Sequence, residues 1–313
     1  MTKTAKLNLT FLLVVITSIG GSYVYAFLTR NRELPIYADL LVAQLLILIP
    51  VWGYTAKEHI NLHKEIRHRR LSFGALLCLV GITILSMPLL SFLNLFSSMF
   101  VPNAAASLAT QMTGGPGWMN ILFLAIIPAF SEEFVFRGVF FHGYRSHGFW
   151  KAALISGLIF GLMHLNFNQF SYGFALGVIF AAVVEASGSI YASMVMHFLI
   201  NFQSAQAINA LTSLTASGVD ESATLELSGV FQQTYMVTAV VIIGIVAVVT
   251  TILVVLLVKL LAKLCDREDY FAWVLRGGEK EALKKRGPRR LIDPFFIGAV
   301  AVCVLFMVFR LML

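Results

Sequence analysis

The chain has 313 residues, of which 58% are hydrophobic and only 12% are charged. A soluble domain does not need so much apolar surface to build its core, so the composition excludes a water-soluble fold and predicts a polytopic membrane protein. The net charge of +7 is first a signal of loop topology in such a protein. The cysteines, Cys78, Cys265 and Cys303, lack CxxC spacing and predict neither a disulfide framework nor a zinc knuckle.

A membrane-spanning helix needs about 20 predominantly apolar residues. Nine stretches qualify: 7–28, 37–55, 72–96, 118–143, 149–165, 170–187, 189–211, 231–262 and 294–313. We therefore predict an all-α fold, a transmembrane helical bundle of eight or nine spans that forms a single membrane domain over residues 1–313. The first stretch also has features of a signal peptide, but its long apolar run and the eight stretches that follow favour an uncleaved helix.

The basic residues predict the orientation, because Lys and Arg are enriched in cytoplasmic loops. The segments 57–70 and 264–293 are strongly basic, whereas the loop 97–117 is uncharged and the loop from about 212 to 230 carries only acidic charges. With a cytoplasmic N-terminus and nine spans, both basic segments fall inside and the other two loops fall outside. We therefore predict a cytoplasmic N-terminus and a basic cytoplasmic linker over 264–293.

Few ionisable or strongly polar side chains interrupt the predicted spans, and they follow one another in three groups. They are Glu132, Glu133 and Arg137 in the fourth stretch, His164 in the fifth, and His197 and Asn201 in the seventh. Such groups are costly at membrane depth, so each predicts a functional site unless a partner explains it. Glu133 and Arg137 are four residues apart and can form an ion pair along one helix, which leaves Glu132 to face something else.

These residue types support two kinds of chemistry. A carboxylate and an imidazole can activate a water molecule as a nucleophile, while a second imidazole and a carboxamide can donate hydrogen bonds to an oxyanion. Two histidines and a glutamate, here His164, His197 and Glu132, can instead hold Zn²⁺ with one open position. The compact HExxH helix is absent, and the spacing alone leaves both interpretations open.

The same residues carry a family resemblance. EEFVFR (132–137), FGLMH (160–164) and HFLIN (197–201) match, in order and on separate apolar stretches, the motifs EExxxR, FxxxH and HxxxN. Over about residues 115–210 the chain thus resembles the CPBP family of intramembrane proteases, the CAAX-protease and bacteriocin-processing group that is also called Abi or Rce1-like. The resemblance implies a helical-bundle endopeptidase with its catalytic core in this segment.

The resemblance also implies a role for each motif residue. Glu132 and His164 would activate water in a glutamate-type mechanism. His197 and Asn201 would stabilise the oxyanion. The motif pair Glu133 and Arg137 would have a supporting role.

The resemblance implies that no cofactor is required, with zinc bound by Glu132, His164 and His197 as the alternative. The expected substrate is a membrane-associated protein or peptide in contact with the lipid bilayer. Bacterial relatives are linked to peptide maturation and self-immunity, so we expect an integral protein of the bacterial plasma membrane. A nucleic-acid partner is not expected, because the basic residues lie in loops that set the topology.

Two other classes of function are compatible with buried polar residues. A non-catalytic membrane scaffold or regulator of the same fold would have no reason to retain the complete set of buried motif residues. A proton- or ion-coupled transporter also uses buried Glu, His and Arg, but such folds usually contain an internal repeat of spans, and none is visible here.

Three further expectations follow from the positions of residues within the predicted spans. Glu132 and His197 lie near the cytoplasmic ends of their stretches, while His164 lies near the outer end of its own, so the fifth helix must be short, late or tilted for the three to meet. Glu185 is expected in a turn that faces water. The glycine pairs in the fifth and sixth stretches predict close helix packing.

Overall fold

The computed structural model describes residues 1–60, 68–216, 221–279, 283–284 and 290–312, and these residues form helices and connecting loops with a single isolated β-bridge. The predicted all-α fold is confirmed. The long helices are α1 (Lys3–Thr29), α2 (Ile36–Lys57), α4 (Phe73–Ser98), α10 (Phe167–Ser187), α11 (Ile190–Ala216), α12 (Glu221–Leu264) and α15 (Pro294–Met312). Shorter helices are α5 (Ala104–Met112), α9 (Phe149–Leu162) and α13 (Glu268–Leu275).

One further helical segment, residues 117–147, changes its hydrogen-bonding pattern along its length. It consists of α6 (Gly117–Asn120), η1 (Ile121–Ile126), α7 (Ile127–Glu133), η2 (Phe134–Phe141), α8 (His142–Tyr144) and η3 (Arg145–His147). Both η1 and η2 are π-helical, and η3 is a turn of 3₁₀-helix.

Within the described residues, 7 helical segments are long and apolar enough to cross a membrane, so the chain is an integral membrane protein. They are α1, α2, α4, the segment 117–147, α10, α15 and residues 237–264 of α12. The other two expected spans are also helical, but α9 has only 14 residues and α11 is less apolar than the rest.

The expected loop from about 212 to 230 is wrong in extent. Helix α11 continues to Ala216 and α12 begins at Glu221, which leaves only 217–220 between them, and these four lie outside the described residues. The stretch 221–230 is polar but contains no proline, so its polarity ends the apolar run without ending the helix.

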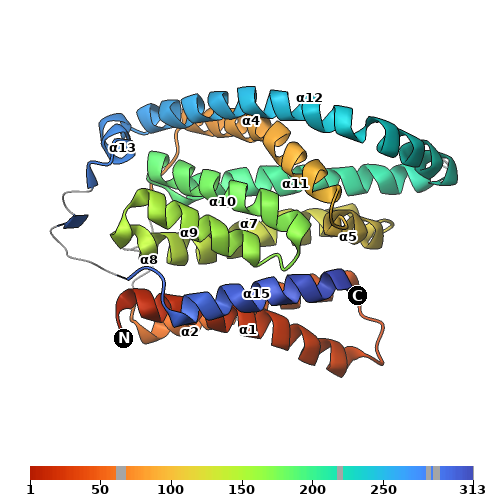
Figure 1. Ribbon diagram of the computed structural model, residues 1–313, viewed down its shortest axis with the longest axis horizontal. Helices are drawn as coiled ribbons and strands as arrows, with labels where there is room; N and C mark the ends of the chain where they lie inside the picture. The colour runs from red at the N-terminus through yellow and green to blue at the C-terminus, as the bar shows by residue number, and fades with distance from the viewer. Residues whose placement is uncertain (61–67, 217–220, 280–282, 285–289, 313) are drawn as a thin grey trace.

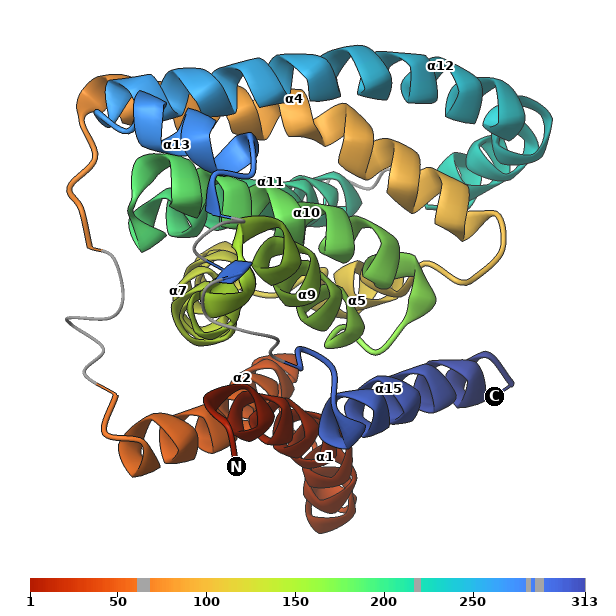
Figure 2. The ribbon, with the colours of Figure 1, turned by 60° about the vertical axis from the view of Figure 1, so that its left-hand side comes forward.

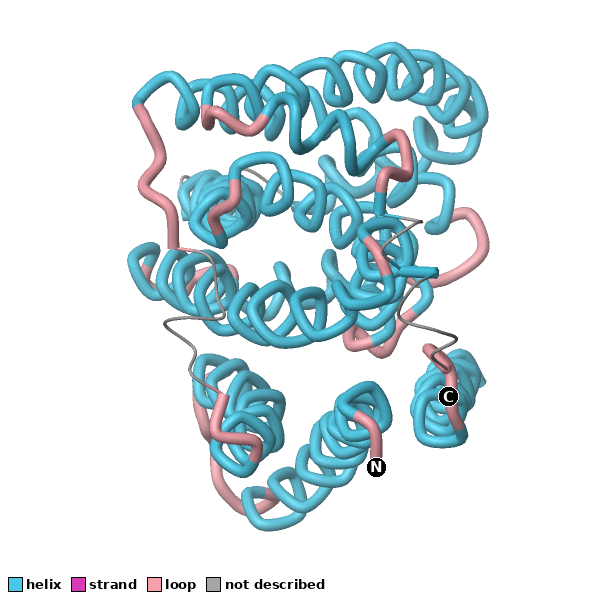
Figure 3. The backbone as a smooth tube through the Cα atoms, turned by 90° about the vertical axis from the view of Figure 1, so that its left-hand side faces the viewer, coloured by secondary structure: helices cyan, strands magenta, loops and turns pink. Residues whose placement is uncertain are grey.

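The helices form a larger bundle and a smaller group beside it. Helices α4 and α12 pack along each other on one side of the bundle, and the segment 117–147, α9, α10 and α11 lie in its middle (Figure 1). The N- and C-terminal helices α1, α2 and α15 form the smaller group on the opposite side (Figures 2 and 3). In this group, α2 contacts α7, η1 and η2, so it lies next to the helical segment that carries Glu132.

Glycines bring α9 and α10 into close contact, as their spacing predicts. A Cβ atom added to Gly177 would lie 2.5 Å from the Cα atom of Gly157, and one added to Gly173 would lie 3.3 Å from the Cα atom of Gly161. Small residues at an interface let two helix backbones approach in this way. The two helices therefore meet backbone to backbone just before the turn that carries His164.

The expectation that Glu185 faces water is wrong. Its side chain is fully buried and accepts two hydrogen bonds from the guanidinium of Arg145, at 2.8 and 2.9 Å, and one from the hydroxyl of Tyr270 at 2.6 Å. Helix α13, from within the predicted linker 264–293, supplies Tyr270 and covers the carboxylate. Residues 280–282 and 285–289 of this linker lie outside the described residues, as do Lys64 and Arg67 of the other basic segment.

Candidate active site

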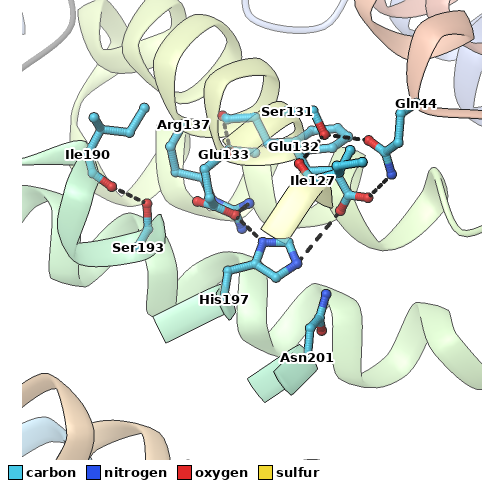
Figure 4. Close-up of polar contacts among 12 residues, drawn as sticks. Gln44, Ile127, Ser131, Glu132, Glu133, Arg137, Ile190, Ser193, His197 and Asn201 are labelled. Atoms are coloured by element: carbon cyan, nitrogen blue, oxygen red, sulfur yellow. Dashed lines mark hydrogen bonds and ion pairs between the residues drawn. The ribbon is translucent and has the colours of Figure 1, made fainter. Parts of the chain in front are cut away.

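The two adjacent glutamates stand at the junction of α7 and η2, and π-helical turns lie on both sides of α7. A π turn is a rare interruption of an α-helix that shifts the register of the residues after it, and such turns occur frequently at functional sites. Glu132 and Glu133 therefore project from a short α-helical stretch that lies between two shifts of the helical register. Figure 4 shows that their side chains meet different partners.

Glu133 forms the predicted ion pair and also binds a histidine. Its Oε1 accepts hydrogen bonds from Arg137 Nη1 at 2.8 Å and from His197 Nδ1 at 2.9 Å. The Glu133 and Arg137 side chains are both 0% exposed. The carboxylate thus neutralises a buried arginine and holds an imidazole in one orientation, and a buried charge requires this kind of pairing.

Glu132 remains accessible and makes a separate set of contacts. Its side chain is 16% exposed, and its Oε1 accepts a hydrogen bond of 2.8 Å from Gln44 Nε2. Its Oε2 lies 3.9 Å from His197 Nε2, which is too far for a direct hydrogen bond, but an oxygen atom beside the line that joins them can contact both. The carboxylate is therefore oriented on one side and available for chemistry on the other.

His164 lies in the turn that follows α9. The helix has 14 residues, which at about 1.5 Å each extend about 21 Å, short of the roughly 30 Å of a hydrocarbon core. The fifth predicted span is therefore a short helix, which is one of the arrangements that the sequence analysis requires if His164 is to meet Glu132 and His197. The ring of Phe160 contacts both His164 and His197, and His197 lies 3.9 Å from Glu132, so the three residues share one site.

The backbone fixes the His164 ring. Its Nδ1 lies 2.9 Å from the carbonyl oxygen of Phe160, which can only accept, so Nδ1 carries the proton and Nε2 of the neutral ring is an acceptor. Gly173 of α10 leaves room for this ring, because a Cβ atom there would lie 3.4 Å from His164 Nδ1 and Cε1. The glycine contact between α9 and α10 thus continues into the site.

Phe160 contacts three of the motif side chains, those of His164, His197 and Arg137. Its ring lies edge-on to the rings of His164, with centroids 5.2 Å apart, and of His197, at 5.8 Å. The Arg137 guanidinium lies 4.4 Å from the centroid of Phe160 and 4.8 Å from that of Phe180, an arrangement typical of cation–π contacts. The phenylalanine of the FxxxH motif therefore contacts both imidazoles and covers the buried arginine.

Asn201 follows His197 by one turn of α11. Its Nδ2 donates a hydrogen bond of 2.9 Å to the carbonyl oxygen of Leu124, in the π-helical turn η1. A carboxamide has two N–H groups, so this contact orients Asn201 and leaves it a second donor.

Zinc bound by Glu132, His164 and His197 is the alternative chemistry for these residues. Among the described residues, no three His, Cys, Asp or Glu side chains are grouped so that they could hold a metal ion. We therefore derive no step through a metal.

Sequence reasoning missed two residues of the site, Gln44 and Ser131. Gln44 is a polar side chain in the middle of the second apolar stretch, which was the available signal, but its partner 88 positions away follows only from the packing of α2 on α7. Ser131 donates to Gln44 Oε1 at 2.6 Å and lies directly before Glu132.

Comparison with known proteins gives one match. Residues 114–203 match a family model described as Rce1-like, Type II CAAX prenyl endopeptidase Rce1-like. All three motifs lie inside the matched segment, so the resemblance drawn from them is confirmed. No curated protein and no solved structure matches the chain. Helix α2, with Gln44, lies outside the match.

Proposed function

We propose that this chain, whose residues 114–203 belong to the Rce1-like family of CAAX-protease-type endopeptidases, hydrolyses a peptide bond of a membrane-associated protein or peptide. One observation carries the proposal: the adjacent glutamates have separate tasks. Glu133 bonds Arg137 and His197, whereas Glu132 is partly exposed and its Oε2 lies 3.9 Å from His197 Nε2, so that one oxygen atom beside them can contact both. A partly exposed carboxylate at membrane depth that lies outside the Glu133–Arg137 ion pair needs a function to explain it.

Glu132 is the general base and then the general acid of the proposed reaction. It takes a proton from a water molecule whose oxygen attacks the carbonyl carbon of the scissile bond. It then returns the proton to the departing amine nitrogen as the C–N bond breaks, so the carboxylate is regenerated. His164 supports the attack, because its unprotonated Nε2 can accept a hydrogen bond from the same water.

His197 and Asn201 stabilise the oxyanion of the tetrahedral intermediate. The hydrogen bond between His197 Nδ1 and Glu133 Oε1 holds the ring so that its Nε2 edge is presented to the oxyanion beside Glu132. The second N–H of Asn201 is the other donor. Donors fixed in place before the reaction stabilise a developing charge without reorganisation, and loss of one commonly costs about 100- to 1000-fold in kcat.

The test is cleavage of membrane-anchored peptides, prenylated and unprenylated, by the purified full chain in liposomes. The arms are the unchanged protein, Glu132→Gln, the exposed-loop control Glu33→Gln, and the unchanged protein with a strong zinc chelator. We expect cleavage in the first, third and fourth arms and its loss in Glu132→Gln. Cleavage that survives in Glu132→Gln would refute the assignment of Glu132, and loss with the chelator would assign a metal-dependent reaction instead.

The setting of this activity is part of the proposal. We place the chain in the bacterial plasma membrane with a cytoplasmic N-terminus, because the basic segments 57–70 and 264–293 then both face the cytoplasm. The prenylated and unprenylated peptides distinguish a CAAX-type substrate from an unmodified peptide that is cleaved during its maturation. We propose that the reaction requires no cofactor.

A further inference from the structure

Gln44 binds the carboxylate of Glu132 but lies outside residues 114–203, the segment that matches the family model. It projects from α2, in the helix group formed with α1 and α15, and its Nε2 donates to Glu132 Oε1 at 2.8 Å. The Gln44 Oε1 accepts from the hydroxyl of Ser131 at 2.6 Å (Figure 4). Both ends of the carboxamide are thus engaged, one by the reacting residue and one by the residue just before it.

The hydroxyl of Ser131 has two acceptors within reach. Besides Gln44 Oε1, its Oγ lies 2.8 Å from the carbonyl oxygen of Ile127, one turn earlier in α7. A hydroxyl carries a single proton and can donate to only one of the two at a time, while its lone pairs can accept. The hydrogen bonds that join Glu132, Gln44 and Ser131 can therefore be arranged in two alternative patterns.

The first pattern fits an ionised Glu132. Gln44 donates through Nε2 to the carboxylate, and Ser131 donates to Gln44 Oε1. The second pattern fits a protonated Glu132: the carboxamide is turned over, its oxygen accepts from the carboxylic acid, and its nitrogen donates to Ser131, whose proton goes to the Ile127 carbonyl. In both states Gln44 keeps one hydrogen bond to Glu132 and one to Ser131, which is valuable at membrane depth, where an unmet polar group is costly.

We propose that Gln44 is a positioning residue that holds Glu132 in one orientation in both of its protonation states, with Ser131 as the hydrogen-bond switch. This rests on the proposed function, in which Glu132 takes up a proton and gives it back. A general base that is alternately ionised and protonated loses its alignment if the neighbouring side chain can form a hydrogen bond with only one of these forms. A carboxamide can form a hydrogen bond with both, because it has a donor and an acceptor.

The charged surroundings of Glu132 make the proposal testable by pH. The groups that face it are Glu133 and Arg137 from its own helical segment, His197 from α11 and His164 from the turn after α9. Gln44 is the neighbour from α2 and is uncharged. Gln44→Glu therefore introduces a second negative charge next to Glu132 and opposes its ionisation, whereas Gln44→Leu removes the donor to the ionised form.

The experiment measures kcat and KM against pH for the full chain in liposomes. The variants are Gln44→Leu, Gln44→Glu and Ser131→Ala. The matched control is Gln111→Leu, an exposed glutamine of α5 whose amide only donates to the Ser107 carbonyl. We expect Gln44→Leu to lower kcat about 10- to 100-fold, the range expected for a lost hydrogen bond to a charged group, with little change in KM. In Gln44→Glu the acid limb of kcat/KM moves to higher pH.

The outcomes separate this proposal from the function on which it rests. If the unchanged protein cleaves and Gln44→Leu cleaves with the same kcat and pH profile, Gln44 has no positioning role. A uniform loss in Gln44→Leu with an unshifted profile in Gln44→Glu means that the residue only supports helix packing. If the unchanged protein cleaves and Glu132→Gln does too, the proposed function fails independently of Gln44.

A second readout does not depend on turnover. Infrared difference spectra across a pH titration report the carboxylic acid band that Glu132→Gln removes. We expect that band to appear at higher pH in Gln44→Glu than in the unchanged protein and to keep its position in Gln111→Leu. An unmoved band in Gln44→Glu overturns the proposal.

Discussion

Removal of the buried guanidinium tests the ion pair that supports the site. In Arg137→Met, the Glu133 carboxylate stays 0% exposed and keeps only His197 of its two partners that donate to Oε1. Removing one partner of a buried ion pair destabilises proteins by about 3–5 kcal/mol. The lost contacts of the guanidinium with Phe160 and Phe180 add roughly 0.5–2 kcal/mol, so we expect a loss of about 3.5–7 kcal/mol.

The double variant Glu133→Gln with Arg137→Met separates charge from packing. With both charges removed, no uncompensated ion remains, and replacement of a buried pair by neutral groups is often close to neutral. We therefore expect the double variant to recover at least half of the stability lost in Arg137→Met alone. The free energy of unfolding of each variant, measured by reversible denaturation in mixed micelles, gives the coupling between the two residues.

An additive result would refute this reasoning. If the double variant is as unstable as the sum of its single substitutions, then Arg137 stabilises the fold by packing against the two aromatic rings and not by neutralising Glu133. Arg137→Lys is the control for charge alone, because it keeps the charge but loses the planar face that lies over Phe160.

Three further predictions concern the surroundings of the site. In Gly177→Val, the new side chain meets the Gly157 backbone, so we expect a loss of about 1–3 kcal/mol by the same denaturation assay and a displaced His164; unchanged stability would contradict the packing of α9 on α10. In Glu185→Ala, Arg145 and Tyr270 lose the carboxylate that accepts hydrogen bonds from both of them. Helix α13 should then detach, and trypsin should cut the 264–293 segment several-fold faster. An unchanged digestion pattern would argue against the attachment of α13 through Glu185. An impermeant thiol reagent on intact cells should label Ser107→Cys and not Asp266→Cys, since the native cysteines are buried, and the reverse result would invert the topology.

The sequence predicts those features that depend on local pattern. Runs of about 20 apolar residues locate the helices, and i, i+4 spacing correctly predicts the ion pair between Glu133 and Arg137. Glycine spacing predicts the α9–α10 contact. Each of these signals lies within one or two helices, so the sequence alone contains it.

Features that depend on distant segments do not follow from local pattern. Glu185 is followed by small residues that are typical of an exposed turn, but α13 folds back over it from 85 positions away. The π turns on both sides of α7 have no propensity signal and change the register that regular helical counting assumes. Glu132 faces Gln44 because α2 packs on α7, and no spacing within the motif segment indicates this contact.

The contact between Gln44 and Glu132 also explains how helices outside residues 114–203 can contribute to the proposed reaction. Helix α2 packs on α1, which packs on α15, so the terminal helices together hold α2 against the segment 117–147. Apolar surfaces do not select one register in lipid, whereas hydrogen bonds between helices are worth about 0.6–2 kcal/mol each and have direction. The bond from Gln44 to Glu132 therefore aligns α2 with the segment and orients the carboxylate at the same time. A core limited to 114–203 would keep every motif residue and lose this alignment, so we infer that proteolysis requires the whole helical assembly.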